Sequence, residues 1–114
     1  MNTDAFLQNI LAFREERDWK QFHNPKDLAI SLVLEAGEVL EHMQWKNGEE
    51  LTERMIERKE KVGEELVDVL YWTLLLAHDL GIDLEEAIQQ KMLQNQSKYP
   101  AHLAKGKSAK YTEL

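Results

Sequence analysis

The chain has 114 residues, of which 43% are apolar and 31% are charged, and 21 acidic residues against 14 basic ones give a formal net charge of −7. This composition fits one domain with a buried core and excludes wholesale disorder. The absence of cysteine excludes a disulfide scaffold, a thiolate zinc site and a cysteine nucleophile. The acidic balance argues against a general binder of nucleic-acid polymers or anionic membranes, although a cation held by carboxylates can still attract a single anionic ligand.

The two ends of the chain differ in charge. The first residues contain no basic segment followed by an apolar one, so we expect no export signal and a cytoplasmic location. The longest strongly apolar stretch, residues 69–77, is too short to span a bilayer. From residue 98 onward four lysines accompany a single glutamate. We therefore expect a helical domain over residues 1–99 and a basic C-terminal tail over residues 100–114.

Apolar residues recur with the 3.6-residue period of a helix in four stretches, and no stretch alternates convincingly with period two. The first stretch runs from about residue 3 to residue 19. The second begins after the N-cap Asn24 and ends near Asn47-Gly48. The third covers residues 52–79 and ends before Gly81, and the fourth begins after the N-cap Asp83 and ends at Pro100. These patterns predict an all-α chain of four main helices.

Two pairs of carboxylates lie on the second and third predicted helices. Glu35 and Glu38 are three residues apart and project from nearly the same side, where their repulsion costs a few tenths of a kcal/mol. A solvated acidic face explains that pair by itself. Asp68, however, lies within the apolar run 66–77, and burying an unpaired carboxylate costs several kcal/mol. We therefore expect Asp68 to be protonated, paired with a cation or bound to a metal, with Glu65 one turn earlier.

If the two helices pack antiparallel, these four carboxylates form a site for a hard cation such as Mg²⁺ or Mn²⁺. Magnesium in such a site takes substrate phosphates as further ligands and activates water, which indicates phosphoanhydride hydrolysis. The chain has no phosphate-binding P-loop. A ferritin-like di-iron centre is disfavoured because neither His42 nor His78 follows a glutamate by three residues. His42 shares a side of its helix with the glutamates and receives no role. His78-Asp79 is weakly similar to HD-type phosphohydrolases.

Other side chains are suited to binding a nucleotide. Lys91, Asn95 and Lys98 form a polar stripe followed by Tyr99, which can meet phosphates but also fits an ordinary solvent-facing surface. Aromatic rings near the ends of the first two helices can stack on a base, although ring packing is the more common reason for such residues. These are Trp19, Phe22, His23 and Trp45.

Five ordered blocks together resemble the all-α nucleotide pyrophosphohydrolases of the MazG superfamily, and most of all the small dCTP pyrophosphatase branch. The likeness continues into the tail. The blocks are Trp19-x-x-Phe22-His23-x-Pro25, Glu35-x-Gly37-Glu38, Gln44-Trp45-Lys46, Glu64-Glu65-Leu66-x-Asp68-Val69-Leu70 and Lys91-Met92-x-x-Asn95-x-x-x-Tyr99-Pro100.

The resemblance implies a four-helix bundle, assembled as a dimer or dimer of dimers, that hydrolyses a nucleoside triphosphate to the monophosphate and pyrophosphate with Mg²⁺. It implies Glu35, Glu38, Glu65 and Asp68 as metal ligands. We also expect Glu35 and Glu38 to be catalytic, with Glu38 accepting the proton of the attacking water. Leu34 and Trp72 depart from the family, which often has glutamate and tyrosine there. The implied substrate contacts are Trp19, His23, Trp45, Lys46, Trp72, Lys91, Asn95, Lys98 and Tyr99.

The sequence thus favours a pyrophosphohydrolase that acts on a deoxynucleotide, dCTP or a modified dCTP, and cleanses the nucleotide pool. It does not rank dCTP against other triphosphates. A second hypothesis remains open, in which a helical oligomer with a structural cation binds nucleotides without turnover, as a sensor or interaction module.

Overall fold

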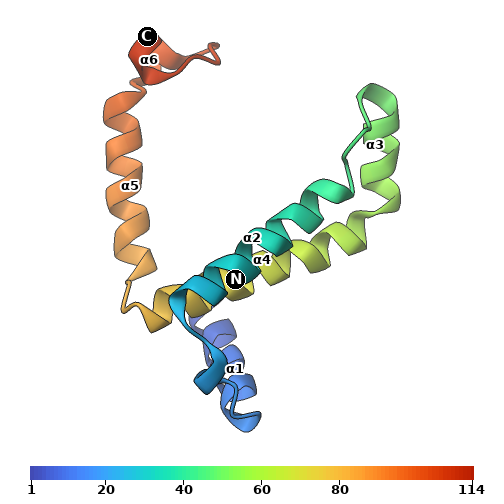
Figure 1. Ribbon diagram of the computed structural model, residues 1–114. Helices are drawn as coiled ribbons and strands as arrows, with labels where there is room; N and C mark the ends of the chain where they lie inside the picture. Colours follow the sequence, from blue (N-terminus) through green and yellow to red (C-terminus); the bar gives the residue numbers. More distant parts are fainter. The chain divides into compact units, whose positions relative to one another are not determined.

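The computed structural model describes residues 1–114, and all of its regular secondary structure is helical, which confirms the all-α prediction. The chain divides into an N-terminal unit, Met1–Gly81, and a C-terminal unit, Ile82–Leu114. The predicted division at residues 99 and 100 stays a prediction. In chain order, the elements are α1 (Thr3–Glu16), the short 3₁₀ helix η1 (Lys20–Phe22), α2 (Pro25–Glu41), α3 (Gly48–Glu57), α4 (Lys59–Asp79), α5 (Leu84–Lys98), α6 (Ala101–Ala104) and the 3₁₀ helix η2 (Tyr111–Glu113) (Figure 1).

The helix ends follow local capping chemistry where the sequence predicts it. The Asn24 side chain accepts a hydrogen bond from the backbone N–H of Asp27 at 2.9 Å and starts α2. Asp83 accepts one from the backbone N–H of Glu86 at 3.1 Å and starts α5. Gly81, with φ of +69°, follows the C-cap of α4 in the left-handed conformation that glycine adopts without a steric penalty. These three boundaries confirm the sequence prediction.

Several predicted boundaries are wrong. The helix α2 ends at Glu41 rather than near Asn47-Gly48, and α3 begins at Gly48 rather than at residue 52. The third predicted helix is two helices, α3 and α4, because Arg58 leaves the helical conformation with φ of −103° and ψ of 10°. The first helix, α1, ends at Glu16 rather than near Trp19, since Asp18 adopts a left-handed φ of +54°, which a short polar side chain tolerates. The chain therefore has five helices of ten or more residues instead of four.

In the N-terminal unit, α2 and α4 lie side by side and α1 packs against α4, while α3 leads directly into the start of α4 (Figure 1). The buried apolar side chains belong to α1, the first turn of α2 and the second half of α4. They are Ile10, Leu28, Leu74, Leu75 and Ala77. This small core fixes α2 against α4 and thereby sets which of their side chains meet.

The first half of α4 is less covered than its sequence predicts. Leu66 and Val67 are 54% and 50% exposed, and Asp68 is exposed as well. The expectation that Asp68 is buried is therefore wrong for the chain by itself, because α2 covers only one side of this part of α4. Any need of this aspartate for a partner therefore comes from the neighbouring carboxylates and not from burial.

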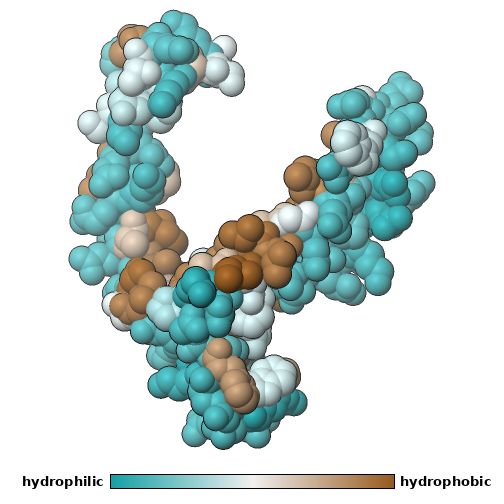
Figure 2. Space-filling model, viewed as in Figure 1, coloured by the Kyte–Doolittle hydropathy of each residue, from teal (hydrophilic) through white to brown (hydrophobic).

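An apolar face also remains exposed on α2. Ile30, Val33, Leu34 and Leu40 are 49%, 66%, 63% and 56% exposed and recur at helical spacing along one side. We call these four residues the α2 apolar face. Figure 2 shows hydrophobic atoms gathered over α2. Contiguous exposed apolar surface of this kind marks an interaction site. None of the helices combines the length and hydropathy needed to cross a membrane.

Candidate functional site

The side-by-side packing of α2 and α4 gathers three carboxylates. One oxygen atom each of Glu35, Glu38 and Glu65 lies within 4.8 Å of the others. The first two project from α2 at a spacing of three residues, and the third projects from α4. The structure therefore brings together three of the four predicted metal ligands. The fourth, Asp68, lies outside this group, although its charge is near enough to raise the pKa of Glu35.

The electrostatics of the cluster favour a bound cation. Burial, and then the neighbouring Glu38, raise the pKa of Glu35. The Glu65 carboxylate, through hydrogen bonding and then through its charge, raises the pKa of Glu38. In addition, Oε2 of Glu35 is buried without a hydrogen-bond partner, an arrangement that is unfavourable for a carboxylate unless something else satisfies it. Oxygen donors with these properties fit a divalent hard cation, which would relieve both the repulsion and the unsatisfied oxygen.

We expect Mg²⁺ to raise the melting temperature more at about pH 8 than at about pH 5.5. Because the folded pKa values of Glu35 and Glu38 lie above the ordinary value of 4.5, the metal-free fold retains protons that the unfolded chain releases. Its stability therefore falls as the pH rises through the folded pKa values. Bound Mg²⁺ opposes this loss, while at lower pH it competes with protons.

Thermal unfolding with MgCl₂ and with EDTA at the two pH values measures this difference. Glu35→Gln should reduce this difference strongly, because the variant removes the cluster carboxylate whose pKa burial raises most directly. Asp79 does not confound the comparison, since Arg14 lowers its pKa below the ordinary 3.8. Equal stabilisation by Mg²⁺ at both pH values would contradict the assignment.

The structure adds a residue to which the sequence analysis gave no role. His42 lies just after α2, and its Nε2 is 3.5 Å from Oε1 of Glu65, with the two side chains only 12% and 20% exposed. Since a carboxylate oxygen only accepts, His42 N–H is the donor of this long hydrogen bond. Such a contact holds a metal-binding carboxylate in place. Its spacing of seven residues from Glu35, two helical turns, is the signal in the sequence.

The predicted aromatic contacts occupy different environments. Trp19 is 43% exposed and packs edge-to-face on Phe13 with ring centroids 5.6 Å apart. Trp72 of α4 packs in the same way against His23 at 5.9 Å. Trp45 is 86% exposed and has a φ of +70°. For a large side chain this left-handed conformation is a real outlier that stores about 1–3 kcal/mol of strain.

The strained Trp45 lies in the turn after α2, and the half-buried Lys46 follows it. An exposed tryptophan in a strained turn contributes little to the core. Strain of this kind gathers at ligand-binding positions, so the conformation agrees with the predicted role of Trp45 in holding a base.

The remaining predicted contacts belong to the C-terminal unit. Lys91, Asn95 and Lys98 are on α5, and the backbone N–H of Tyr99 donates to the carbonyl oxygen of Asn95 at 2.8 Å. The Lys98 ammonium lies 4.9 Å from the ring centroid of Tyr111. That ring also packs edge-to-face on Tyr99 at 6.0 Å. The tail therefore folds against the end of the polar stripe.

A surface pocket of about 420 Å³ lies elsewhere in the N-terminal unit. It contains none of the predicted site residues. Its lining residues are Leu11, Arg14, Glu15, Asp18, Lys20 and His78.

Comparison with known proteins finds a matching family model, several similar relatives and a similar solved structure. A family model described as the MazG-like family matches residues 30–114, a range that contains all four predicted carboxylates. Two proteins named dCTP pyrophosphatase 1, from Rattus norvegicus and Homo sapiens, are 43% and 45% identical over 104 residues. These matches cover 90% of this chain but 61% of each relative, so the chain spans about three fifths of their length.

The crystal structure of a pyrophosphatase from Archaeoglobus fulgidus has a similar fold, with a TM-score of 0.82 and 38% sequence identity. This similarity covers 86% of the chain and 92% of the archaeal protein. The family resemblance predicted from the sequence blocks is thus confirmed, and the chain belongs to the MazG-like family.

Proposed function

We propose that this chain is a Mg²⁺-dependent nucleoside triphosphate pyrophosphohydrolase that converts dCTP, or a modified dCTP, and water to the monophosphate and pyrophosphate. The observation that carries the proposal is the cluster of Glu35, Glu38 and Glu65, together with the unsatisfied Oε2 of Glu35. The names of the rat and human relatives support dCTP as the substrate. The physiological role in this proposal is cleansing of the nucleotide pool.

In the proposed mechanism, Glu35, Glu38, Glu65 and Asp68 hold the cation. A bound Mg²⁺, or Mn²⁺, would polarise a phosphoryl oxygen and lower the pKa of a water molecule. Glu38 is the more exposed carboxylate of the α2 pair, so it can reach the attacking water and accept its proton. Glu35 is more desolvated than Glu38. Its role in the proposal is to hold the cation beside the α-phosphate of the substrate.

The remaining predicted residues bind the nucleotide in this proposal. Aromatic rings and their neighbours would hold the base and sugar by stacking and hydrogen bonding. Basic and polar groups of α5 would neutralise the phosphates. The first set is Trp19, His23, Trp45, Lys46 and Trp72, and the second is Lys91, Asn95, Lys98 and Tyr99.

The test is pyrophosphate release from a panel of triphosphates. We expect the highest kcat/KM with dCTP or 5-substituted dCTP, no release with EDTA, and recovery with Mg²⁺. Phosphorus NMR should show dCMP and pyrophosphate rather than dCDP and phosphate. Saturable nucleotide binding without release at high Mg²⁺ would overturn the proposal in favour of a nucleotide-binding sensor.

We also propose that a second copy of the chain covers the α2 apolar face and completes a helical bundle, giving a dimer or a tetramer built from dimers. The support is the exposure of four apolar side chains along one side of α2. Burying apolar surface is favourable by about 25 cal/mol per Å². An exposed apolar patch of this kind therefore favours association with another molecule.

Val33→Glu is expected to shift the assembly to monomers, because a charge on a buried apolar interface costs several kcal/mol. Light scattering during size-exclusion chromatography measures the mass. Val33→Leu, which keeps the position apolar, is the matched control and should keep the wild-type mass. A monomeric wild type, or an unchanged mass for Val33→Glu, would rule out this interface.

A further inference from the structure

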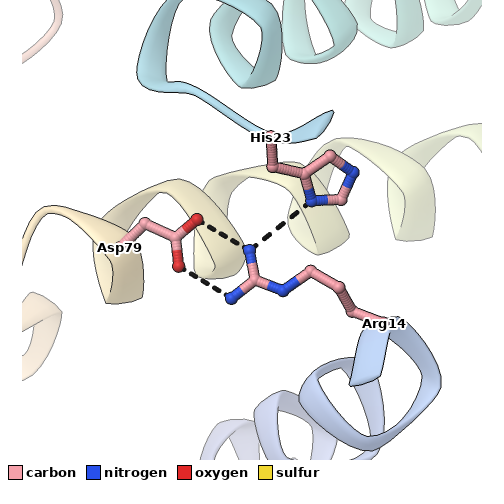
Figure 3. A network of polar contacts seen from close by, with 3 residues as sticks. All are labelled: Arg14, His23 and Asp79. Carbon is pink, nitrogen blue, oxygen red and sulfur yellow. Dashed lines mark hydrogen bonds and ion pairs between the residues drawn. The ribbon is translucent and has the colours of Figure 1, made fainter. Parts of the chain in front are cut away.

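Arg14 is the one charged side chain that the fold buries, with only 4% exposed. It lies on α1 and donates two hydrogen bonds, from Nη1 and Nη2 to the two carboxylate oxygens of Asp79, at 2.7 and 2.9 Å. Figure 3 shows the two groups facing each other as a fork. This two-point geometry fixes the plane of the guanidinium as well as its position. Sequence analysis assigned neither residue to the site.

His23 is the third member of the network. Its Nδ1 lies 3.5 Å from Nη1 of Arg14. Because a guanidinium has only donors, Nδ1 must be the acceptor of this long hydrogen bond, and the ring proton of the neutral imidazole is then on Nε2. In Figure 3 the second ring nitrogen of His23 points away from Arg14, and no protein group forms a hydrogen bond with it. The ring also packs edge-to-face on Trp72.

Burial, with help from the Arg14 charge, favours the neutral form of His23. Burial lowers the pKa of His23 most, the Arg14 charge from α1 lowers it further, and the Asp79 charge at the end of α4 acts in the opposite direction. After Arg14, the charges of His78 and of Lys20 in η1 lower the pKa of Asp79 further. At neutral pH the imidazole is therefore a donor at one nitrogen only. A purely structural ion pair between α1 and α4 has no need of this histidine.

We propose that Arg14 and Asp79 are positioning residues, which hold His23 as an Nε2–H donor for an acceptor atom of the substrate's pyrimidine ring. Cytosine offers two acceptors on this edge, its O2 and N3 atoms. Arg14 does not touch the substrate but selects the tautomer and orientation of the ring that does. The inference rests on the proposed function, in which His23 is a base contact.

The tautomer is measured directly by ¹⁵N–¹H NMR of the imidazoles, without any turnover. The wild type should show the His23 proton on Nε2 at neutral pH, and the Nε2 signal should shift when dCMP is added. Arg14→Lys, which keeps a cation but loses the fork, should give a mixture of tautomers. A wild-type proton on Nδ1, a charged ring, or an unmoved signal with dCMP would overturn the proposal.

A pair of substitutions at His23 tests the same idea kinetically. The amide of His23→Gln reaches the Nε2 position, whereas that of His23→Asn reaches only the Nδ1 position, so His23→Gln should raise KM for dCTP less than His23→Asn does. We expect His23→Asn and Arg14→Lys each to raise KM by about 2- to 10-fold, the worth of one hydrogen bond, with kcat nearly unchanged. In a protein that already carries His23→Gln, Arg14→Lys should not raise KM for dCTP further.

If Arg14→Lys raised KM equally in the wild type and in the His23→Gln variant, Arg14 would have a merely structural role and the proposal would be overturned. Far-UV circular dichroism and the melting temperature verify that each variant is folded. If Arg14→Lys does not fold, the comparison of the two His23 variants still tests the proposal. A wild type with the Nε2–H tautomer that releases no pyrophosphate would instead refute the proposed function, so the two failures are distinguishable.

Discussion

Glu65→Gln should lower pyrophosphate release from dCTP by on the order of 100- to 1,000-fold, the usual cost of removing one electrostatic partner of a transition state. Glu65 is the member of the carboxylate cluster that comes from α4. An amide at this position removes one negative charge and one strong oxygen donor. It also changes the group that meets His42. The affinity for Mn²⁺, followed by electron paramagnetic resonance in the absence of nucleotide, should fall together with turnover.

The neighbouring Glu64 provides a matched control. Its side chain is 69% exposed and lies 4.0 Å from Lys61, a surface pair of the kind that contributes about 0–1 kcal/mol. Glu64→Gln makes the same change in charge one residue away and should leave turnover and Mn²⁺ affinity within about twofold of the wild type. Equal losses in the two variants would mean that the general acidity of α4, rather than the cluster, binds the cation.

Trp45→Gly is expected to change binding and stability in opposite directions. The loss of a stacked ring costs about 1–3 kcal/mol per base, so KM for dCTP should rise by about 5- to 150-fold. Glycine relieves about 1–3 kcal/mol of strain at the φ of +70°, and its greater freedom in the unfolded chain costs about 0.5–1 kcal/mol. Because Trp45 is 86% exposed, little packing is lost, and the melting temperature should not fall.

Trp45→Asn is the companion variant, because asparagine tolerates the left-handed region while retaining a Cβ. It should also lose affinity for dCTP without a loss of stability. Kinetics and thermal unfolding of the two variants measure these effects. A fall in melting temperature together with unchanged KM would show that Trp45 is a structural residue instead of a base contact.

Local chemistry predicts much of this fold. The caps at Asn24 and Asp83 use side chains within three residues of the groups they bind, so the sequence alone indicates them. The break at Arg58 has no such signal, because charged residues with good helix propensity lie on both sides of it. The all-α class therefore follows from periodicity, whereas the number of helices does not.

For the candidate site, spacing predicts which carboxylates share a helix face but not what covers them. Glu35, Glu38 and Glu65 meet because α2 packs on α4, as the antiparallel arrangement requires. The exposure of Asp68 depends on surfaces far away in sequence. Arg14 and Asp79 are 65 residues apart, and nothing in the pattern of either helix indicates that they pair. Long-range polar contacts of this kind emerge only once the helices are packed.

The contact between Lys98 and Tyr111 has a practical consequence for handling this protein. An aromatic ring beside an exposed ammonium contributes about 0.5–1 kcal/mol and limits the directions in which the ammonium can point. Shortening the chain after residue 109 would leave α5 intact yet release that lysine to sample many rotamers. Affinity tags are therefore better attached at the N-terminal end, because Tyr111 near the other end lies against Lys98 and Tyr99.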